Sequence, residues 1–387
     1  MRANPGGEIA PDEIIGRDRL IERLWRVLER QSLILSAERR MGKTCVIRKM
    51  AAYPPDNKLI VLRNVEDLGS PLEFVQAVLQ DVEQYLSKYK RTARKTRELL
   101  KNLADIELKG MGLGIKLPDI AAPHWKNLLT QTIEDLLEVR EGDRLIFFWD
   151  EMPHMLRQME ANEAMEMLDV LRRLRQTYGT LRMVFTGSIG LHHVIDKLRK
   201  SGYTGEPTND MYPLDVPPLL EEDGTTLATL LIQGESISTF EIQTTAREIA
   251  RMVDCVPFYI HHLIEALALQ GETIDERVVN ETIDDCLSSP QNRWQMEHYS
   301  DRIEFYYSSE RRKYALGLLD ALAESDEGLS LDELCDRLRS DPDTEDKEET
   351  RKVLNLLAKD YYIVKDKELK YRFRLDLIER YWKLSRG

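Results

Sequence analysis

Short apolar runs alternate along the first half of the chain with stretches in which apolar residues recur every three or four positions. The runs are rich in branched or aromatic residues, which is typical of buried strands, and they lie at 32–36, 59–62, 145–149 and 181–188. The intervening periodic stretches predict helices, the longest at 71–85, 125–139 and 164–178. Strands that alternate with helices predict an α/β fold with a doubly wound, largely parallel sheet.

Beyond Gly205 the pattern changes. Four prolines mark a boundary region, and they stand at Pro207, Pro213, Pro217 and Pro218. The stretches that follow have helical periodicity and no strong strand, and they lie at 225–231, 244–253, 258–268 and 275–287. This part of the chain is predicted to form a helical lid.

The tail has a third pattern. Three helical stretches precede two short strands about a charged turn, and these segments are 311–324, 330–339, 349–359 and 361–374. Three helices followed by a β-wing predict a winged helix-turn-helix. We therefore expect three domains, at 1–205 with an insertion at 87–123, at 206–305 and at 306–387.

One loop carries the clearest candidate chemistry. An apolar run ends at Ser36, the loop closes on Gly42-Lys43-Thr44, and a helical pattern follows. In a phosphate-binding loop of this layout, backbone N–H groups wrap the phosphates, the lysine reaches the β and γ oxygens, and the threonine hydroxyl holds Mg²⁺. The candidate nucleotide-binding residues are Ala37, Glu38, Arg39, Arg40, Met41, Gly42, Lys43, Thr44 and Cys45, with Lys43 also a catalytic candidate.

Ala37 departs from the motif, which has glycine at that position. The turn must therefore avoid a positive φ at Ala37 or accept strain of about 1 kcal/mol. We expect this substitution to lower the rate of turnover and to leave binding intact.

Two carboxylates follow the third apolar run. Asp150 and Glu151 come at the C-terminal end of that strand, where open parallel sheets bind their ligands. Asp150, with Thr44, is the candidate metal-binding group, and Glu151 is the candidate for polarising an attacking water. The fourth strand ends with Thr186 and Ser188, which are either contacts to a γ-phosphate or its water, or part of a simple turn; the residues alone leave both interpretations open.

Composition narrows the class of protein. The chain has 387 residues, of which 42% are hydrophobic and 32% charged, as in a globular protein of two or three domains. No apolar run approaches the roughly 18 residues that a membrane span needs, and the N-terminus lacks an apolar signal core, so we expect a cytoplasmic protein with no membrane partner.

Four scattered cysteines favour reduced thiols over disulfides or a zinc site. The histidines show no ligand spacing, and the adjacent side chains of His192 and His193 should diverge by about 100° on a helix.

A net charge of −13 argues against a protein that coats nucleic acid through charge alone. The basic clusters at 88–101 and 172–175 are candidates for a local basic surface, although a solvated helix face is the alternative for both and the favoured interpretation of the first. The glycine-rich run at 109–115 does not fit a dinucleotide fingerprint and favours a loop.

Several further motifs occur in order along the chain. They are Gly16-Arg17-Asp18, Arg39-Arg40 ahead of Gly42-Lys43-Thr44, Asp150-Glu151, Gly187-Ser188-Ile189-Gly190, Val256-Pro257-Phe258-Tyr259, Tyr371-Arg372-Phe373-Arg374 and Arg380-Tyr381-Trp382. This set, which extends over nearly the whole chain, resembles the archaeal-type ATPase family within the STAND/AAA+ group of P-loop NTPases. The resemblance implies an AAA+/STAND-like parallel-sheet core, a helical lid and a C-terminal winged helix-turn-helix, with ATP and Mg²⁺ as cofactors.

The resemblance also implies roles for single residues. Gly16 and Arg17 would lie beside the adenine, Ser188 would be the sensor on the fourth strand, and Pro257 would belong to a lid motif that senses the nucleotide state. Cys255 stands where such lids often carry glycine.

The mechanism that this resemblance favours is in-line attack of water on the γ-phosphate of ATP. Members of the wider class often complete the site with an arginine from a neighbouring subunit. Arg199 is the first candidate for this arginine, and Arg182 and Arg175 are its rivals. The residues do not exclude GTP.

Three functional classes remain. The first is a slow ATPase that acts as a conformational and oligomerisation switch and recruits a protein or nucleic-acid partner, by analogy in mobile-element or phage-defence biology. The second is an ATP-regulated DNA-binding protein, which the basic wing at 365–374 favours and the acidic start of the third tail helix at 344–349 opposes. The third binds nucleotide and barely hydrolyses it. We favour the first, as a homo-oligomer with a protein partner.

Overall fold

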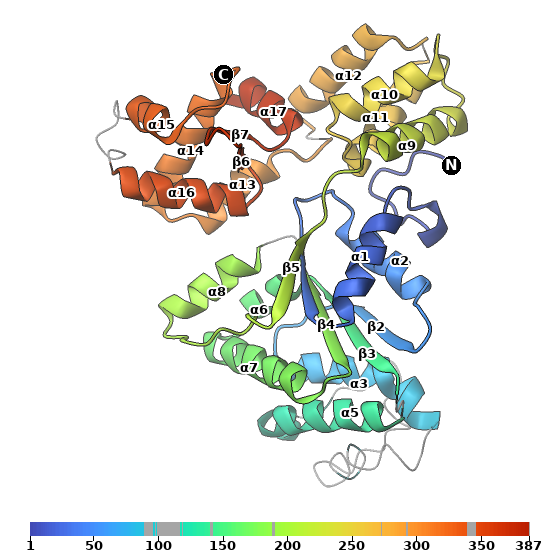
Figure 1. Cartoon of the computed structure of the whole chain (residues 1–387), viewed down its shortest axis with the longest axis vertical. Helices are drawn as coiled ribbons and strands as arrows, with labels where there is room; N and C mark the ends of the chain where they lie inside the picture. The colour runs from blue at the N-terminus through green and yellow to red at the C-terminus, as the bar shows by residue number, and fades with distance from the viewer. Residues whose placement is uncertain are drawn as a thin grey trace. The chain divides into compact units, whose positions relative to one another are not determined.

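The computed structural model of the chain describes residues 1–88, 96, 98, 117, 119–139, 142–187, 190–271, 273–291, 293–338 and 346–386. Most of the predicted insertion at 87–123 lies outside these residues, together with most of the basic cluster at 88–101, the glycine-rich run at 109–115 and Ser188. The chain divides into two units (Figure 1). A sheet unit comprises Asp18–Ser36 and Lys43–Val216, and a helical unit comprises Met1–Arg17, Ala37–Gly42 and Pro217–Gly387.

The sheet unit is built on five parallel strands. In chain order they are β1 (Ser32–Ser36), β2 (Lys58–Asn64), β3 (Arg144–Asp150), β4 (Leu181–Thr186) and β5 (Met211–Asp215). They lie in the order β2-β3-β4-β1-β5, so β1 pairs with β4 and β5 rather than with β2. The four predicted strands and their parallel pairing are confirmed.

Strand β5 was not predicted, because Met211–Asp215 lies in the stretch that its prolines mark as a boundary region. This strand contains Pro213, which lies opposite Ile34 in the register with β1. A proline cannot donate to a strand ladder, so it is tolerated at the edge of a sheet, and β5 is the edge strand beside β1. Pro213, which marks a boundary in the sequence, is therefore part of the edge strand of the sheet.

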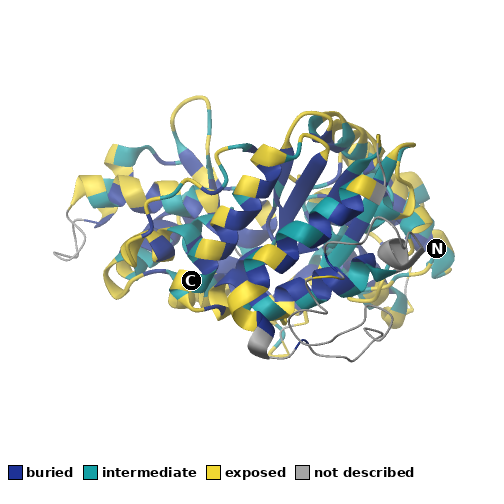
Figure 2. Cartoon of the chain, turned by 90° about the horizontal axis from the view of Figure 1, so that it is seen from below, coloured by how far each residue is buried: buried dark blue, intermediate teal, exposed yellow. Residues whose placement is uncertain are grey.

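Helices cover both faces of the sheet. On one face the indole of Trp25, from α1 (Asp18–Leu28), lies 6.3 Å from the ring of Phe148. On the other face Phe147, Trp149 and Phe185 share one hydrophobic core with residues of five further helices. These helices are α3 (Pro71–Lys88), α5 (Trp125–Val139), α6 (Met152–Gln158), α7 (Ala161–Thr177) and α8 (Leu191–Lys200). Figure 2 shows the strands in the dark blue of buried residues.

The near-continuous apolar sequence of β3 follows from this two-sided packing. Residues Leu145 to Trp149 are all at most 2% exposed, so neither face of the strand can carry a polar side chain cheaply. The strand reaches its first carboxylate only at Asp150, where the sheet ends.

The helical unit begins with four helices in the predicted lid region, and every predicted helix is present. They are α9 (Glu221–Gly234), α10 (Ile242–Met252), α11 (Pro257–Gln270) and α12 (Glu276–Ser288). Asp275 caps α12 by accepting a hydrogen bond from the N–H of Val278 at 2.9 Å. Such a cap satisfies one of the free donors at a helix start, and the sequence carries it at the expected place.

The tail contains the predicted order of three helices and two strands. They are α14 (Ser309–Ala323), α15 (Leu331–Leu338), α16 (Lys347–Lys359), β6 (Ile363–Lys365) and β7 (Tyr371–Phe373), and β6 and β7 pair in an antiparallel hairpin. Among the described residues, three α-helices were not predicted, namely α6, α13 (His298–Tyr306) and α17 (Asp376–Arg386). α17 contacts the lid, because Asp254 accepts hydrogen bonds from the N–H groups of Asp376 and Leu377 at its first turn.

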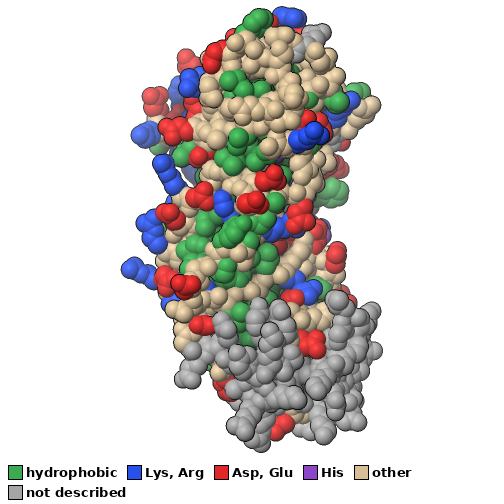
Figure 3. All heavy atoms as spheres, turned by 90° about the vertical axis from the view of Figure 1, so that its right-hand side faces the viewer, with side chains coloured by type: hydrophobic (Ala, Val, Ile, Leu, Met, Phe, Trp, Pro, Cys, Tyr) green, Lys and Arg blue, Asp and Glu red, His purple; other side chains and the backbone are tan. Residues whose placement is uncertain are grey.

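The charged side chains do not form large patches of one sign on the face drawn in Figure 3. On the face drawn in Figure 3, acidic and basic side chains are interspersed rather than segregated. Among the described residues, no helix combines the length and the apolar character that crossing a bilayer requires.

The N-terminal segment is fastened to the lid through a neutral histidine. The N–H of Asn4 donates to Nδ1 of His261 at 3.1 Å, which requires that nitrogen to be unprotonated. His261 is 6% exposed, and burial lowers its pKa from 6.5 to about 4.

We expect His261 to make the helical unit sensitive to acid. The unfolded chain binds the imidazole proton at a higher pH than the folded chain. The contribution of neutral His261 to the free energy of unfolding is therefore fully present above pH 6.5 and is lost as the pH falls towards 4. His261→Gln should remove about 2–3 kcal/mol of the loss between pH 7 and pH 4.5. Urea unfolding at several pH values measures this, and parallel pH profiles for the variant and the wild type would contradict it.

Candidate nucleotide site

Two hydroxyl groups in the sheet unit converge on the carboxylate of Asp150. Thr44, in the first turn of α2 (Lys43–Ala52), donates to Oδ2 of Asp150 at 2.7 Å. Thr186, the last residue of β4, donates to Oδ1 of the same carboxylate. Asp150 is only 4% exposed. The buried carboxylate of Asp150, at the end of β3, thus connects the end of β4 with the start of α2. Thr44 and Asp150, the two residues that the sequence predicts as metal ligands, lie side by side.

Lys43 begins α2 and is 8% exposed. A helix start presents free N–H groups and the positive end of the helix dipole, which favour a bound anion. A lysine at this position adds its own positive charge to the same place. Cys45 follows in the same turn, is half-buried and forms no disulfide with a described residue.

Glu151 has an unusual backbone conformation. Its φ and ψ are 59° and 33°, in the left-handed region, where non-glycine residues are uncommon. The residue lies between β3 and α6, so this conformation sets the direction of the turn that carries its carboxylate. Strained backbone of this kind concentrates at functional sites, and Glu151 is where the sequence predicts the water-polarising group.

The predicted phosphate loop, from Ala37 to Gly42, groups with the helical unit. Ala37 is not among the described non-glycine residues with positive φ, so the loop avoids the strain that this substitution threatened. The left-handed positions are instead Arg40, at φ 72°, and Gly42, at φ 82°. Arg40 holds this conformation with its guanidinium 4.0 Å from the ring of Phe258 and donating to Oε1 of Gln295.

The loop's other side chains differ in exposure. Arg39 is exposed, whereas Met41 and Glu38 are each 2% exposed. Oε1 of Glu38 accepts from the N–H of Arg39 at 2.7 Å and from the guanidinium of Arg302 on α13 at 2.8 Å. Burial raises the pKa of Glu38, but the neighbouring Arg302 guanidinium and the His298 ring outweigh this effect and lower the pKa below its ordinary value. Nothing in the sequence pattern indicated Arg302 as a partner of the loop.

Gly16 and Arg17 connect the start of the chain with the loop. Gly16 has φ 71°, and a Cβ on it would lie 2.5 Å from Cβ of Asp223, so only glycine fits. Arg17 is 3% exposed and donates to the carbonyl oxygens of Met41 at 2.7 Å and Pro217 at 2.8 Å. These bonds tie the loop backbone to the beginning of the lid segment.

The backbone ahead of Pro257 has a conformation that favours glycine at position 255. Asp254 and Cys255 have φ values of 53° and 54°, two consecutive left-handed residues before α11. Cys255 accepts this conformation while its Sγ lies 3.2 Å from the position that a Cβ on Gly224 would take. Pro257 then begins α11, and the next residue, Phe258, is the ring that contacts Arg40 of the loop.

The three candidate arginines lie in different surroundings. Arg175 is buried and forms two hydrogen bonds of 2.9 Å with the carboxylate of Asp210. Arg182 is 9% exposed and donates to the carbonyl oxygens of Leu28 at 3.0 Å and Gly179 at 2.8 Å. The side chain of Arg199, on α8, is 45% exposed, and Glu206 holds it at 2.6 Å. Of the three, Arg199 is the most exposed.

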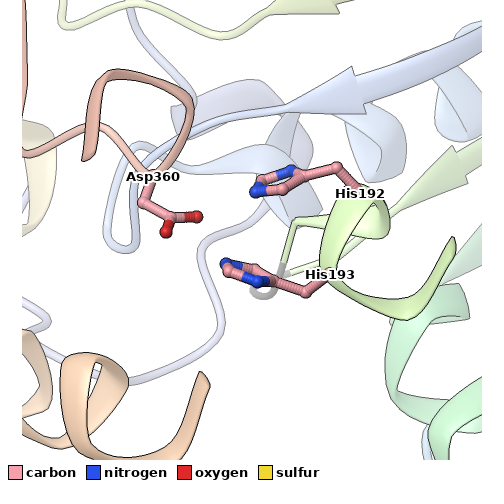
Figure 4. A group of neighbouring side chains, drawn as sticks. All are labelled: His192, His193 and Asp360. Carbon is pink, nitrogen blue, oxygen red and sulfur yellow. The ribbon is translucent and has the colours of Figure 1, made fainter. Parts of the chain in front are cut away.

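His192 and His193 correct one expectation. Their rings lie close together at the start of α8, with centroids 4.3 Å apart, as Figure 4 shows. The prediction of diverging side chains is therefore wrong for this pair. In the first turn of a helix no preceding turn restricts the rotamers, so side chains of adjacent residues can swing together.

The chain is similar to several solved structures. It matches the Walker-type ATPase PABY2304 of Pyrococcus abyssi with 17% identity and a TM-score of 0.68, over 99% of this chain and 100% of that one. It also matches the ORC2 protein of Aeropyrum pernix with 13% identity and a TM-score of 0.46, over 98% and 97% of the chains. A mutant RuvB of Thermotoga maritima matches with 12% identity and a TM-score of 0.41, over 94% of both. No family model and no curated protein matches the chain.

The likeness to PABY2304 and the strand order together establish the fold. The chain has a P-loop NTPase fold of the AAA+ type, in which a parallel five-stranded sheet is followed along the chain by a helical region. The predicted fold class is confirmed.

Proposed function

We propose that this protein binds ATP together with Mg²⁺ and hydrolyses it slowly, as a switch. The observation that carries the proposal is the buried carboxylate of Asp150, which accepts hydrogen bonds from both Thr44 and Thr186. Carboxylate and hydroxyl oxygens are the ligands that Mg²⁺ prefers, and the donor set at this point of the fold fits that ion. Bound Mg²⁺ would neutralise charge on the phosphate oxygens.

Each residue of the site then has a role. Lys43 and the loop N–H groups hold the phosphates, Thr44 and Asp150 hold the metal, and Glu151 orients and polarises the attacking water. We retain Ser188 as the proposed sensor, although it lies outside the described residues. Thr186 positions Asp150 through its hydroxyl.

The nucleotide's base would be held near Gly16 and Arg17. Because Gly16 leaves room against Asp223 and Arg17 ties the loop to Pro217, these residues fix the local backbone on which the adenine would rest. Pro257 would then report the nucleotide state through Phe258 and Arg40.

Binding through Lys43 is the direct test. Lys43→Ala should weaken ATP binding about 10–100-fold, because a charge-assisted hydrogen bond to phosphate is worth about 1.5–3 kcal/mol. Lys49→Ala, on the same helix, is the matched control, since Lys49 forms an ion pair with Asp18 at 2.8 Å. Calorimetric titration with ATP and Mg²⁺ measures both. A wild type that binds neither ATP nor GTP would contradict the proposal.

The switch is proposed to work through assembly. An arginine that reaches a neighbouring subunit's γ-phosphate must be exposed, and of the three candidates Arg199 meets this condition best. We therefore propose a homo-oligomer whose assembly depends on ATP, with Arg199 completing the site of the adjacent copy.

DNA binding is the second candidate. We take the three helices and the hairpin of the tail to be a winged helix, and Lys365, Lys367 and Arg372 are exposed on its hairpin, as a phosphate-binding wing would require. The third helix, α16, opposes this reading. Its first turn carries Glu348 and Glu349, which form ion pairs with the basic side chains that follow on the same helix. We therefore favour a protein partner for this domain, and DNA titration in low salt distinguishes the two.

A further inference from the structure

The buried carboxylate of Glu38 ties the phosphate loop to a distant part of the helical unit. Arg302, on α13, donates one guanidinium nitrogen to Oε1 of Glu38 at 2.8 Å. The side chain of Arg302 is 12% exposed and that of Glu38 is 2% exposed. Charges buried so deeply depend on their partners, and removing one of them leaves the other with much less compensation.

The second guanidinium nitrogen of Arg302 continues to the hairpin. It donates to the carbonyl oxygen of Asp360 at 3.0 Å and lies 3.9 Å from the carboxylate of the same residue. Asp360, labelled in Figure 4, follows the last residue of α16 as its C-cap and leads into the turn before β6. It is 2% exposed, and its Oδ2 accepts from the hydroxyl of Tyr307 at 2.7 Å. The guanidinium also lies 5.5 Å from the ring of Tyr362.

One arginine fork thus bonds to the loop on one side and to the residue that precedes the hairpin on the other. A planar guanidinium can make both bonds at once, and a lysine ammonium in its place cannot reproduce that fork. The neighbouring loop residue Arg40 is held separately, by Phe258 and Gln295. The path through Arg302 is therefore distinct from the contact between the loop and α11.

We propose that Arg302 is a positioning residue, which fixes the phosphate loop through Glu38 and connects its state to the C-terminal hairpin through Asp360. This inference rests on the proposed nucleotide binding. Nucleotide that settles the loop in one conformation must favour the same arrangement of Glu38, Arg302 and Asp360. By reciprocity, a disturbance at Arg302 weakens nucleotide binding, and a partner bound at the hairpin alters it.

Hydrogen exchange of the full chain, with and without ADP and Mg²⁺, tests the connection. In the wild type, nucleotide should slow exchange of the amides in β6 and β7. In Arg302→Gln that response should be lost, and ADP affinity should fall about tenfold. Arg277→Gln is the matched control and should behave as the wild type. Arg277 is an exposed arginine of α12 and pairs along its own helix with Glu281 at 2.9 Å.

A double variant separates positioning from a general loss of stability. Glu38→Gln with Arg302→Gln removes both charges of the Glu38–Arg302 pair, so its affinity should lie above that of Arg302→Gln alone, which leaves Glu38 without its arginine. Should Arg302→Gln fail to fold, Arg302→Lys takes its place, keeping the charge but losing the fork. The melting temperature of every variant is measured as well. It shows whether nucleotide affinity depends on the Glu38–Arg302 pair or merely changes with overall stability.

The outcomes are distinct. A wild type that binds no nucleotide overturns the proposed function and this inference together. A wild type that binds ADP, with affinity and hairpin exchange unchanged by the loss of Arg302, overturns the inference alone. Weakened affinity without any nucleotide effect on β6 and β7 also overturns it, because the connection to the hairpin is then absent.

Discussion

Replacing Glu151 with glutamine is expected to slow phosphate release by about 10²–10³-fold while ATP stays bound. A positioned base or water-orienting carboxylate contributes a factor of this size to proton transfer, and the amide keeps the shape of the side chain without its charge. Glu151 follows the buried strand β3, and its left-handed backbone is compatible with glutamine as it is with glutamate. The binding residues Lys43 and Thr44 are left intact.

The measurement combines phosphate release with mass photometry, in the presence and absence of ATP. Glu160→Gln is the control, because Glu160 is an exposed glutamate ahead of α7 that makes no capping bond. A switch of the proposed kind should accumulate as an assembled, ATP-bound form in the Glu151 variant. Equal release by Glu151→Gln and wild type would rule Glu151 out as the water-orienting group, and a wild type that binds ATP without assembly or release would remove the hydrolytic mechanism from the isolated chain.

The proximity of two candidate site residues could be predicted because it depends on residue types in a fixed order. Thr44 and Asp150 are 106 positions apart, yet each follows an apolar run that predicts a buried strand of one parallel sheet. In such a sheet the strand ends meet at one edge, so the two side chains were expected together. Their hydrogen bond of 2.7 Å agrees with that expectation.

The supports of the site could not be predicted in the same way. Glu38 and Arg302 are 264 positions apart, and a charged residue at either place has no neighbour in sequence that reveals its partner. Long-range ion pairs depend on how helices pack, which periodicity does not specify. The same limit applies to β5, because Pro213 reads as a strand breaker unless the edge position of its strand is known.

Backbone conformation was predictable only as a pair of alternatives. Ala37 in place of glycine required either a negative φ or strain, and the loop adopts the former. At Cys255, where the family that the sequence resembles often carries glycine, the chain accepts a φ of 54°. Two substitutions of the same kind are thus resolved in opposite ways, because Cys255 follows Asp254 in a turn whose geometry the surrounding lid holds.

Truncation of Trp149 should destabilise the sheet unit by about 3–5 kcal/mol. Its indole is fully buried and lies 4.9 Å from the ring of Phe74, 5.0 Å from Phe147 and 6.0 Å from Phe185. Trp149→Ala removes these contacts and leaves a cavity that the flanking strands cannot close, which is the costliest kind of core substitution. Since Asp150 is the next residue, the loss should also loosen the end of β3.

Trp149→Phe separates lost volume from lost aromatic packing. The indole N–H of Trp149 is buried without a hydrogen-bond partner among the described residues, so phenylalanine removes an unsatisfied donor together with part of the ring. We therefore expect Trp149→Phe to cost less than about 1.5 kcal/mol. Urea unfolding followed by circular dichroism measures both variants, and hydrogen exchange at β3 and β4 assigns the change to the sheet unit. Equal losses for the two variants would mean that the indole N–H has a partner after all, and that the packing of this core depends on it.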